Sequence, residues 1–323
     1  MLVSVALSLL CGESLSLSES VRGIVRGPWS DDAHAMIMWW VRIPELLAAL
    51  IAGATLALAG AAMQSLMRND LADPYLMGVA SGGGVGAALA LSLGLINLLG
   101  LWILPMMSFG GALLASVWIE LYARRLDARN GSLGSTQQVI LAGVALSLCL
   151  SSLLTLILAL SEERLGGVWR WLIGHIHGLS WVDLGLMSFG ACIGGGTLLR
   201  LQRALSLMQA GEEVAWTLGV PTRRVRSLTL LATSCSVGAV VAYCGAIGFV
   251  GLLVPHAIRP RISGESHHLF GLSALYGAGV LCLCAWIAKM APVPLPVGVI
   301  TGVLGGGMFL YTQYRISAPY HEQ

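Results

Sequence analysis

The sequence predicts an all-α protein that crosses a membrane several times within a single domain, residues 1–323. Hydrophobic residues make up 56% of the chain and charged residues only 11%, whereas about a quarter of an ordinary soluble domain is charged. The apolar residues form long continuous runs, and a membrane-spanning helix needs about 20 such residues. Ten-residue segments of alternating polarity, which indicate a membrane β-barrel, are missing. We therefore expect about ten transmembrane helices.

Charges and turn residues divide the first half of the chain into five candidate spans. These are residues 1–17, 44–67, 75–95, 101–122 and 137–159. The first contains only about ten consecutive apolar residues, half of the length that a span requires. Pro44 suits the first turn of the second span, where its missing N–H costs nothing. In the third span, Gly78, Gly82 and Gly86 recur every four residues and would let another helix pack closely.

The second half of the chain contains five more candidate spans. They cover residues 182–200, 227–243, 245–262, 268–288 and 294–313. The second and third of these meet at Cys244 and Gly245 with almost no loop. The last carries Gly298, Gly302 and Gly306 at four-residue spacing, on one helix face. Most glycines of the chain lie inside such apolar runs, which is typical of closely packed membrane helices rather than of disorder.

Basic residues are distributed unequally between the two ends of the expected spans. Twelve of the eighteen fall on one side: Arg68, Arg124, Arg125, Arg129, Arg200, Arg203, Arg223, Arg224, Arg226, Arg259, Arg261 and Arg315. The other six fall on the opposite side: Arg22, Arg26, Arg42, Arg164, Arg170 and Lys289. Short cytoplasmic loops of membrane proteins are rich in arginine and lysine, so we expect the first side to be cytoplasmic. Both termini then face the cytoplasm.

Several catalytic and nucleotide-binding motifs are missing from the sequence. A phosphate-binding loop needs a lysine followed by serine or threonine, but the single lysine, Lys289, precedes Met290. Neither H-E-x-x-H nor G-x-S-x-G occurs. Glu45, Glu120 and Asp183 lie near expected span ends, so no carboxylate is placed for ion coupling at a span centre. We therefore expect no enzyme activity in this chain, and the energy for any uphill transport should come from another chain.

The cysteines and histidines show no metal-binding spacing. The cysteines are scattered, mostly within apolar runs, and form no C-x-x-C pair, which is typical of small packing residues. His175 and His177 flank one residue, and His267 and His268 are adjacent in a polar turn. We interpret both pairs as solvated loop residues, with a ligand site as the less favoured alternative. His256 follows a proline near a span end, where packing is the simpler interpretation. No metal site and no cofactor are expected in this chain.

One charged segment, GEEVAWTLGVPTRRVR at residues 211–226, interrupts the apolar sequence. Glu212 and Glu213 favour the first turn of a short helix because acids complement the helix dipole. Gly219 suits the end of that helix, and Pro221 can begin a second one. We therefore expect two short cytoplasmic helices with a sharp bend between them. They could lie on the lipid head groups, but a rigid docking element for a cytoplasmic partner is the preferred interpretation.

Six sequence blocks resemble one family of membrane proteins over nearly the whole chain. The blocks are RIPELLAALIAGATLALAGAAMQSLMRNDLADPYLMGVASGGGVGAAL at 42–89, LAGVALS at 141–147, WLIGHIHGLSW at 171–181, GEEVAWTLGVPTRRVR at 211–226, GAIGFVGLLVPHAIR at 245–259 and LPVGVITGVLGG at 295–306. In this order and spacing they are similar to the FecCD family, the permease subunits of ABC importers for ferric siderophores, haem and vitamin B12. The resemblance implies a ten-helix subunit that forms a homodimer or pairs with a close paralogue.

The same resemblance implies the other partners of this chain. Two cytoplasmic ABC ATPase subunits would bind ATP and magnesium, so no cofactor is needed here. Residues from about 206 to 226 correspond to the coupling helices that are seated in the ATPase. The matching residues are Gly211, Glu212, Glu213, Ala215, Leu218, Gly219 and Pro221. A periplasmic substrate-binding protein would dock on the opposite side. The lipid bilayer is a further partner, and nucleic acid is not.

For the docking of the binding protein, the resemblance indicates Arg42, Glu45 and Lys289. Relatives often carry a basic residue where this chain has Glu45, so one charge of the expected surface is reversed. The chain also departs from the family near its end, where Pro294 precedes Leu295 and two glycines replace the common alanine and proline. The residues expected to pack helices or to line a pathway are Gly78, Gly82, Gly86, Gly298 and Gly302.

Together these features predict the permease subunit of an importer in a bacterial inner membrane. A ferric siderophore, or alternatively haem or vitamin B12, would cross along the axis of a dimer by alternating access, driven by ATP hydrolysis in the partner. A secondary transporter or channel that needs no ATPase is the alternative, although the cytoplasmic helix pair would then have no role. An intramembrane enzyme is disfavoured because the catalytic motifs are missing.

Overall fold

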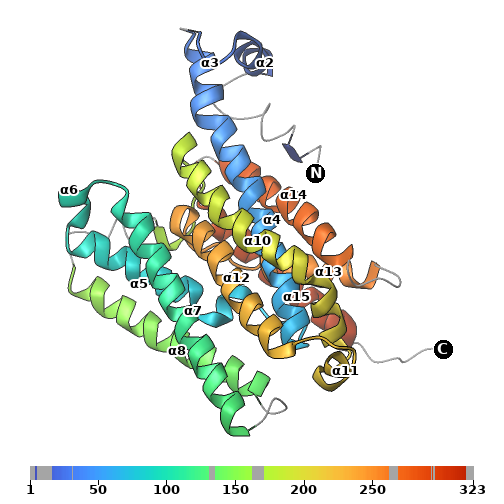
Figure 1. The fold of residues 1–323 in the computed structure, drawn as a ribbon. Helices are drawn as coiled ribbons and strands as arrows, with labels where there is room; N and C mark the ends of the chain where they lie inside the picture. The colour runs from blue at the N-terminus through green and yellow to red at the C-terminus, as the bar shows by residue number, and fades with distance from the viewer. Residues whose placement is uncertain are drawn as a thin grey trace.

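The computed structural model describes residues 4–5, 17–30, 32–130, 135–161, 171–261, 268–291, 293 and 295–317, and every regular element in this part of the chain is a helix (Figure 1). The long helices are α4 (Ile43–Met67), α7 (Ile103–Asn130), α8 (Ser135–Ala159), α10 (Trp181–Gln209), α12 (Thr222–Cys244), α14 (His268–Lys289) and α15 (Val297–Ser317). The shorter helices are α2 (Leu17–Arg26), α3 (Ala33–Ile37), α5 (Val79–Ser92), α6 (Leu95–Leu99), α11 (Glu212–Thr217), α13 (Val250–Ile258), the π-helix η1 (Met38–Arg42) and the 3-10 helices η2 (Pro74–Met77) and η5 (Arg259–Arg261).

Within the described residues, six helices are long and apolar enough to cross a bilayer. They are Ala33–Met67, Ile103–Leu126, Gln138–Ala159, Trp181–Gln209, Thr222–Cys244 and His268–Lys289. Two shorter apolar helices, Val79–Ser92 and Val297–Tyr311, accompany them. The expectation of an all-α, multi-pass membrane protein is therefore confirmed, whereas the expected number of ten spans is not. The first expected span, residues 1–17, lies almost entirely outside the described residues.

The longest helix runs through α3, η1 and α4, from Ala33 to Met67. Its start is set by Asp32, whose carboxylate accepts the His34 N–H at the N-cap. Pro44 lies in the first turn of α4, as expected, but α4 directly follows the π-helical segment Met38–Arg42. Proline and a π turn both interrupt the regular backbone ladder, and here they are adjacent. The expected span 44–67 therefore agrees with α4, whereas the helical segment before it, α3 and η1, was not predicted.

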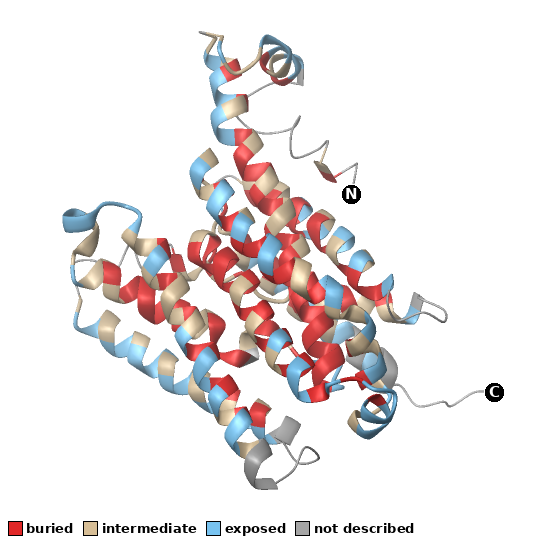
Figure 2. Ribbon diagram, in the orientation of Figure 1, coloured by how far each residue is buried: buried red, intermediate tan, exposed pale blue. Residues whose placement is uncertain are grey.

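The helix α4 lies at the centre of the bundle and contacts α10, α12, α13 and α14 (Figure 1). Buried residues are concentrated on α4 and α12 (Figure 2). Two of the contacts place backbone against backbone, because Gly53 faces Gly277 of α14 and Gly60 faces Gly251 of α13. At both positions an added Cβ would overlap the opposing backbone, so glycine is required for this approach.

A second group, formed by α5, α7 and α8, packs against the main bundle through α12 (Figure 1). Gly82 of α5 lies against Gly111 of α7, and Gly86 lies against the Met107 carbonyl. The helix α8 contacts α5 and α7, but only 6% of its most apolar stretch is buried. Most of α8 is therefore not covered by this chain (Figure 2).

Two expected spans are interrupted by glycines with positive φ. The stretch 75–95 divides into η2, Gly78 at φ +74° and then α5, whose 14 residues extend only about 21 Å. The stretch 245–262 begins with a turn at Gly245, at φ +70°, and α13 has only nine residues. Glycine adopts a positive φ without steric cost, and this conformation ends a helix even inside an apolar run. The prediction of complete helical spans at 75–95 and 245–262 is therefore wrong.

Candidate functional site

The charged segment forms α11, a short helix that stands apart from the long helices (Figure 1). Gly211 is its N-cap. At the other end, the Val220 N–H donates to the Ala215 carbonyl and the Gly219 N–H donates to the Trp216 carbonyl, each at 2.9 Å. These two bonds, with Gly219 at φ +82°, form a Schellman motif. Gly219 therefore ends the short helix, as its position in the sequence predicts.

The second short helix, expected after Pro221, is instead the beginning of a long one. Pro221 is the N-cap of α12, which continues from Thr222 to Cys244. The Val225 N–H donates to the Pro221 carbonyl at 3.0 Å, so the helical hydrogen bonds start at once. The arginines and apolar residues that follow are compatible with a helix, and no proline interrupts them. The prediction of two short helices is therefore wrong, and α11 alone is the compact element.

The outer face of α11 carries three exposed apolar side chains beside the exposed Glu213 and Thr217. Val214, Trp216 and Leu218 are 46%, 72% and 61% exposed. Beside them is an open groove of about 770 Å³, lined by Glu212, Glu213, Trp216, Thr217, Pro221, Thr222, Arg223 and Arg224. Exposed apolar side chains with a charged rim are typical of a protein interface, and tryptophan and arginine are frequent anchors there. We call the exposed face formed by Val214, Trp216 and Leu218, with this groove, the candidate coupling surface.

The inner face of α11 is fixed to the helix bundle. Ala215 is fully buried, and Glu212 borders a small gap among the ends of α4, α8, α10 and α12. Burial raises the pKa of the Glu212 carboxyl, while a hydrogen bond with Thr222 and the charges of Arg68 and Arg223 act in the opposite direction. The attachment of α11 therefore involves the ends of several long helices.

At the other end of α4, three segments meet at one buried carboxylate. Glu45 is 6% exposed, and its Oε2 accepts from the Lys289 Nζ at 2.6 Å. Its Oε1 lies 3.2 Å from the His177 Nδ1 and accepts the Gly178 N–H at 3.3 Å. The carboxylate thus joins α4, the end of α14 and the loop before α10. His177, which we expected to be a solvated loop residue, is instead a partner of Glu45.

Arg42 is also buried at this end of the bundle. It is 7% exposed, and its Nη1 lies 3.3 Å from the Ser20 Oγ of α2, to which it donates. Nearby, the Trp181 Nε1 donates to the Trp39 carbonyl of η1 at 3.0 Å. All three residues predicted to dock a binding protein therefore contact side chains of this chain, and two of them are buried. An open docking surface needs exposed side chains, so the docking role of these residues stays a prediction.

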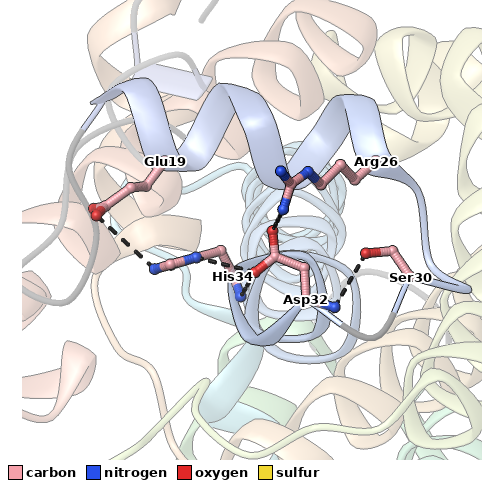
Figure 3. Close-up of polar contacts among 5 residues, drawn as sticks. All are labelled: Glu19, Arg26, Ser30, Asp32 and His34. Atoms are coloured by element: carbon pink, nitrogen blue, oxygen red, sulfur yellow. Dashed lines mark hydrogen bonds and ion pairs between the residues drawn. The ribbon is translucent and has the colours of Figure 1, made fainter.

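Polar contacts hold α2 against α3 at the same end (Figure 3). Asp32 accepts from Arg26, lies 3.1 Å from the His34 Nδ1, and donates its own N–H to the Ser30 Oγ at 3.1 Å. Glu19 of α2 lies 3.9 Å from the His34 Nε2. The hydrogen bond from the His34 N–H and the Arg26 guanidinium lower the pKa of the Asp32 carboxyl, against the opposing effect of burial. The Asp32 carboxylate therefore remains charged at neutral pH, and its contacts fix α2 against α3.

The glycines expected to pack helices or to line a pathway have different surroundings. Gly82 and Gly86 lie against α7, and Gly298 lies against the loop before α10. Gly78 is the N-cap of α5 rather than part of it, so the pair Gly78 and Gly82 is not a motif on one helix face. An added Cβ at Gly302 would meet no atom within 4 Å. Three of the five therefore pack closely, and their role in a pathway stays a prediction.

Two features of the site escape the sequence prediction. Trp216 is the most exposed large apolar side chain of α11, and an aromatic residue inside a charged segment was the signal for it. The contacts of Glu45 with His177 and Lys289 join residues 132 and 244 positions apart, and no local pattern indicates them. Within the part of the chain that the structure describes, no group of three or more histidine, cysteine, aspartate or glutamate residues could hold a metal ion.

Known proteins are similar to the chain over nearly its whole length. The sequence model of the FecCD transport family matches residues 1–315. The uncharacterised ABC transporter permease protein YvrB of Bacillus subtilis (strain 168) is 36% identical, over 97% of this chain and 91% of its own length. The vitamin B12 import system permease protein BtuC of Salmonella paratyphi A is 37% identical, over 96% of this chain and 93% of its own. A solved structure of a metal-chelate type ABC transporter in an inward-facing conformation has a TM-score of 0.84 and 28% identity, covering 97% of this chain and 96% of that one.

Proposed function

The chain belongs to the FecCD transport family, and from this premise we propose that it imports a metal chelate as the permease subunit of an ABC transporter. The family match covers residues 1–315, so the proposal concerns the whole helix bundle. Relatives that are named for vitamin B12 and for metal chelates support a large chelate as the substrate. A ferric siderophore, haem or vitamin B12 would thus pass from the periplasm to the cytoplasm.

The observation that carries this proposal is the geometry of α11. Its inner face is fixed to the bundle through Ala215, whereas Val214, Trp216 and Leu218 are exposed for a partner. An ABC ATPase, which binds ATP and magnesium, would hold the candidate coupling surface and displace α11 when it closes. Because α11 is short and attached to the ends of several long helices, the displacement would move these helices. Different contacts in the two states would then shift the bundle between outward and inward access.

A second permease subunit, as a homodimer partner or a paralogue, is part of the same proposal. Only 6% of the most apolar stretch of α8 is buried, and α15 exposes Val303, Leu310, Tyr311 and Tyr314. Lipid alone would cover these surfaces equally well, but a pathway that encloses a large solute would need helices from a second subunit in addition to those of this bundle. The substrate would cross between the two subunits, and a periplasmic binding protein would deliver it at the end that contains Glu45.

Reconstitution into liposomes tests the proposed function. The chain, an ABC ATPase and a binding protein should together show ATP hydrolysis that is stimulated by the loaded binding protein, and uptake of the chelate that depends on ATP. Deletion of residues 211–220 should abolish capture of the ATPase while the helical content stays the same. Uptake by the chain alone, without an ATPase, would contradict the proposal and would support a channel or a secondary transporter.

A further inference from the structure

A basic groove lies between α7 and α12, near the end of the bundle that carries α11. Its volume is about 510 Å³. The residues that line it are Glu120, Ala123, Arg124, Arg223, Arg224, Arg226, Ser227, Leu228 and Leu231. Four arginines and one glutamate give this groove a marked positive charge. It shares Arg223 and Arg224 with the candidate coupling surface but contains no residue of α11.

The single carboxylate of the groove does not neutralise its arginines. Glu120 is 4% exposed and accepts from the Arg124 Nε at 2.7 Å and from the Ser227 hydroxyl. Arg226, which is 5% exposed, interacts with the same carboxylate. Arg224 is exposed, and it has no acidic partner among the residues that the structure describes. Arg223 also acts on the carboxyl of Glu212, which lies outside this groove, so Arg224 is the arginine that carries the excess positive charge of the outer rim.

Along the axis of α7, the groove lies at the level where the surface of the bilayer is expected. On another face of α7, Trp118 and Tyr122 stack with their ring centroids 5.7 Å apart, and Trp118 is 50% exposed. Exposed tryptophan and tyrosine residues are enriched at the interface between a bilayer and water. Glu120 lies between these two residues along α7, so the charged part of the groove is at the same height. Leu228 and Leu231 lie deeper, about 6 to 10 Å from Arg224 along α12.

We propose that this groove binds the head group of an anionic phospholipid of the cytoplasmic leaflet. The guanidinium groups of Arg223 and Arg224 match the charge and geometry of phosphate oxygens. Leu228 and Leu231 would contact the adjoining part of an acyl chain. Basic pockets between transmembrane helices on the cytoplasmic side suit such lipids. The bound lipid would join the ends of α7 and α12 beside the helix that an ATPase is proposed to move.

Free phosphate offers arginine the same oxygens as a lipid phosphodiester, and an acidic surface of an ATPase could also approach these arginines. The inner end of the groove distinguishes the three ligands. Leu228 is 47% exposed and lies at the end of the groove that is nearer to the expected hydrocarbon region of the bilayer. Of the three ligands, only a lipid supplies apolar groups at that depth. The lipid is therefore the ligand that uses both ends of the groove.

Lipid titration of the full chain in detergent, followed by native mass spectrometry, tests this proposal. Phosphatidylglycerol should bind more tightly than phosphatidylcholine. Arg224→Gln should weaken the binding of phosphatidylglycerol about fivefold, the factor that corresponds to the attraction of one arginine near an anionic lipid surface. The double variant Arg223→Gln/Arg224→Gln should weaken it further. Arg203→Gln is the matched control, because Arg203 is an exposed arginine of α10 on the same expected side but outside the groove.

A second set of measurements separates the lipid from the other ligands. Leu228→Gln should weaken the binding of phosphatidylglycerol, and millimolar inorganic phosphate should not displace it. Displacement by inorganic phosphate, with no effect of Leu228→Gln, would overturn the proposal in favour of a free-anion site. Unchanged lipid binding by Arg224→Gln would also overturn it. If the same variant lost capture of an ATPase instead, the groove would be part of the ATPase interface.

Discussion

Replacement of Gly60 by alanine tests the close packing at the centre of the bundle. Gly60 of α4 faces Gly251 of α13, and a Cβ added at Gly60 would lie 2.5 Å from the carbonyl carbon and 2.7 Å from the Cα of Gly251. Carbon atoms in contact are normally about 3.5 to 4.0 Å apart, and the Gly251 carbonyl oxygen lies still closer to the added Cβ, so the two backbones would have to separate by more than about 1 Å. Overpacking costs about 1 to 3 kcal/mol. Because backbone atoms cannot rotate away, we expect a cost near the upper value.

The matched control for this variant is Gly196→Ala in α10. A Cβ at Gly196 meets no atom within 4 Å, so this change should be neutral or stabilise the chain by up to about 1 kcal/mol through helix propensity. The free energy of unfolding of each variant is measured by equilibrium unfolding of the purified chain in mixed detergent, followed by helical circular dichroism. If Gly60→Ala unfolds like the original chain, the close approach of α4 and α13 is refuted.

Further variants test the polar network, the half-buried Asp73 and the end of α11. Glu45→Gln removes the carboxylate that pairs with Lys289, and we expect it to cost about 2 kcal/mol, less than for a fully buried pair because the Lys289 side chain is 21% exposed. In a double-mutant cycle with Lys289→Met, strictly additive costs would show that the two side chains do not interact. Burial raises the pKa of the Asp73 carboxyl from 3.8 to about 6, so the folded chain binds the carboxyl proton more tightly than the unfolded chain does. The free energy of unfolding should therefore fall as the pH rises from about 4 to 6, by at most about 3 kcal/mol. Asp73→Asn keeps the acceptor for the Tyr75 N–H and should therefore stabilise the chain near neutral pH but not near pH 4; an equal effect at both pH values would contradict this. Gly219→Ala places a Cβ on a residue at φ +82°, which should destabilise the end of α11 by about 1 kcal/mol and speed the exchange of its amide hydrogens. Asparagine tolerates this φ, so the α11 amides of Gly219→Asn should exchange more slowly than those of Gly219→Ala.

Long apolar helices without internal turns could be predicted from the sequence. The expected span 268–288 agrees closely with α14, His268–Lys289, and the span 137–159 with α8, Ser135–Ala159. In both cases polar or charged residues bound one continuous apolar run. Membrane helices of this kind are determined by local composition, because each must satisfy its backbone hydrogen bonds within the segment.

Helix ends inside apolar runs could not be predicted in the same way. Gly78 and Gly245 adopt positive φ values, whereas neighbouring glycines of similar sequence context, such as Gly82 and Gly86, are helical. The choice depends on contacts with distant segments, because Gly245 lies against the Trp171 carbonyl. Hydropathy is insensitive to these contacts, so it overestimates the length of both spans.

The candidate coupling surface was more predictable than the network at Glu45. The acids, Gly219 and Pro221 of the charged segment act locally, so they indicate a short helix and its end. The same residues do not show that α12 follows directly, because a proline at a helix start is compatible with a short or a long helix. The partners of Glu45 come from two segments distant in sequence, and only the packing of α4 with α14 brings them together.

The most direct test of the proposed function is ATP hydrolysis by a reconstituted transporter with an altered α11. Trp216 and Leu218 are 72% and 61% exposed, so Trp216→Ala/Leu218→Asp should leave the stability of the isolated chain unchanged. We predict that this variant no longer captures the ATPase and loses both stimulated ATP hydrolysis and uptake of the chelate, while Arg203→Gln retains all three. Full stimulation of ATP hydrolysis and full uptake by the α11 variant would contradict the role of α11 as the coupling element.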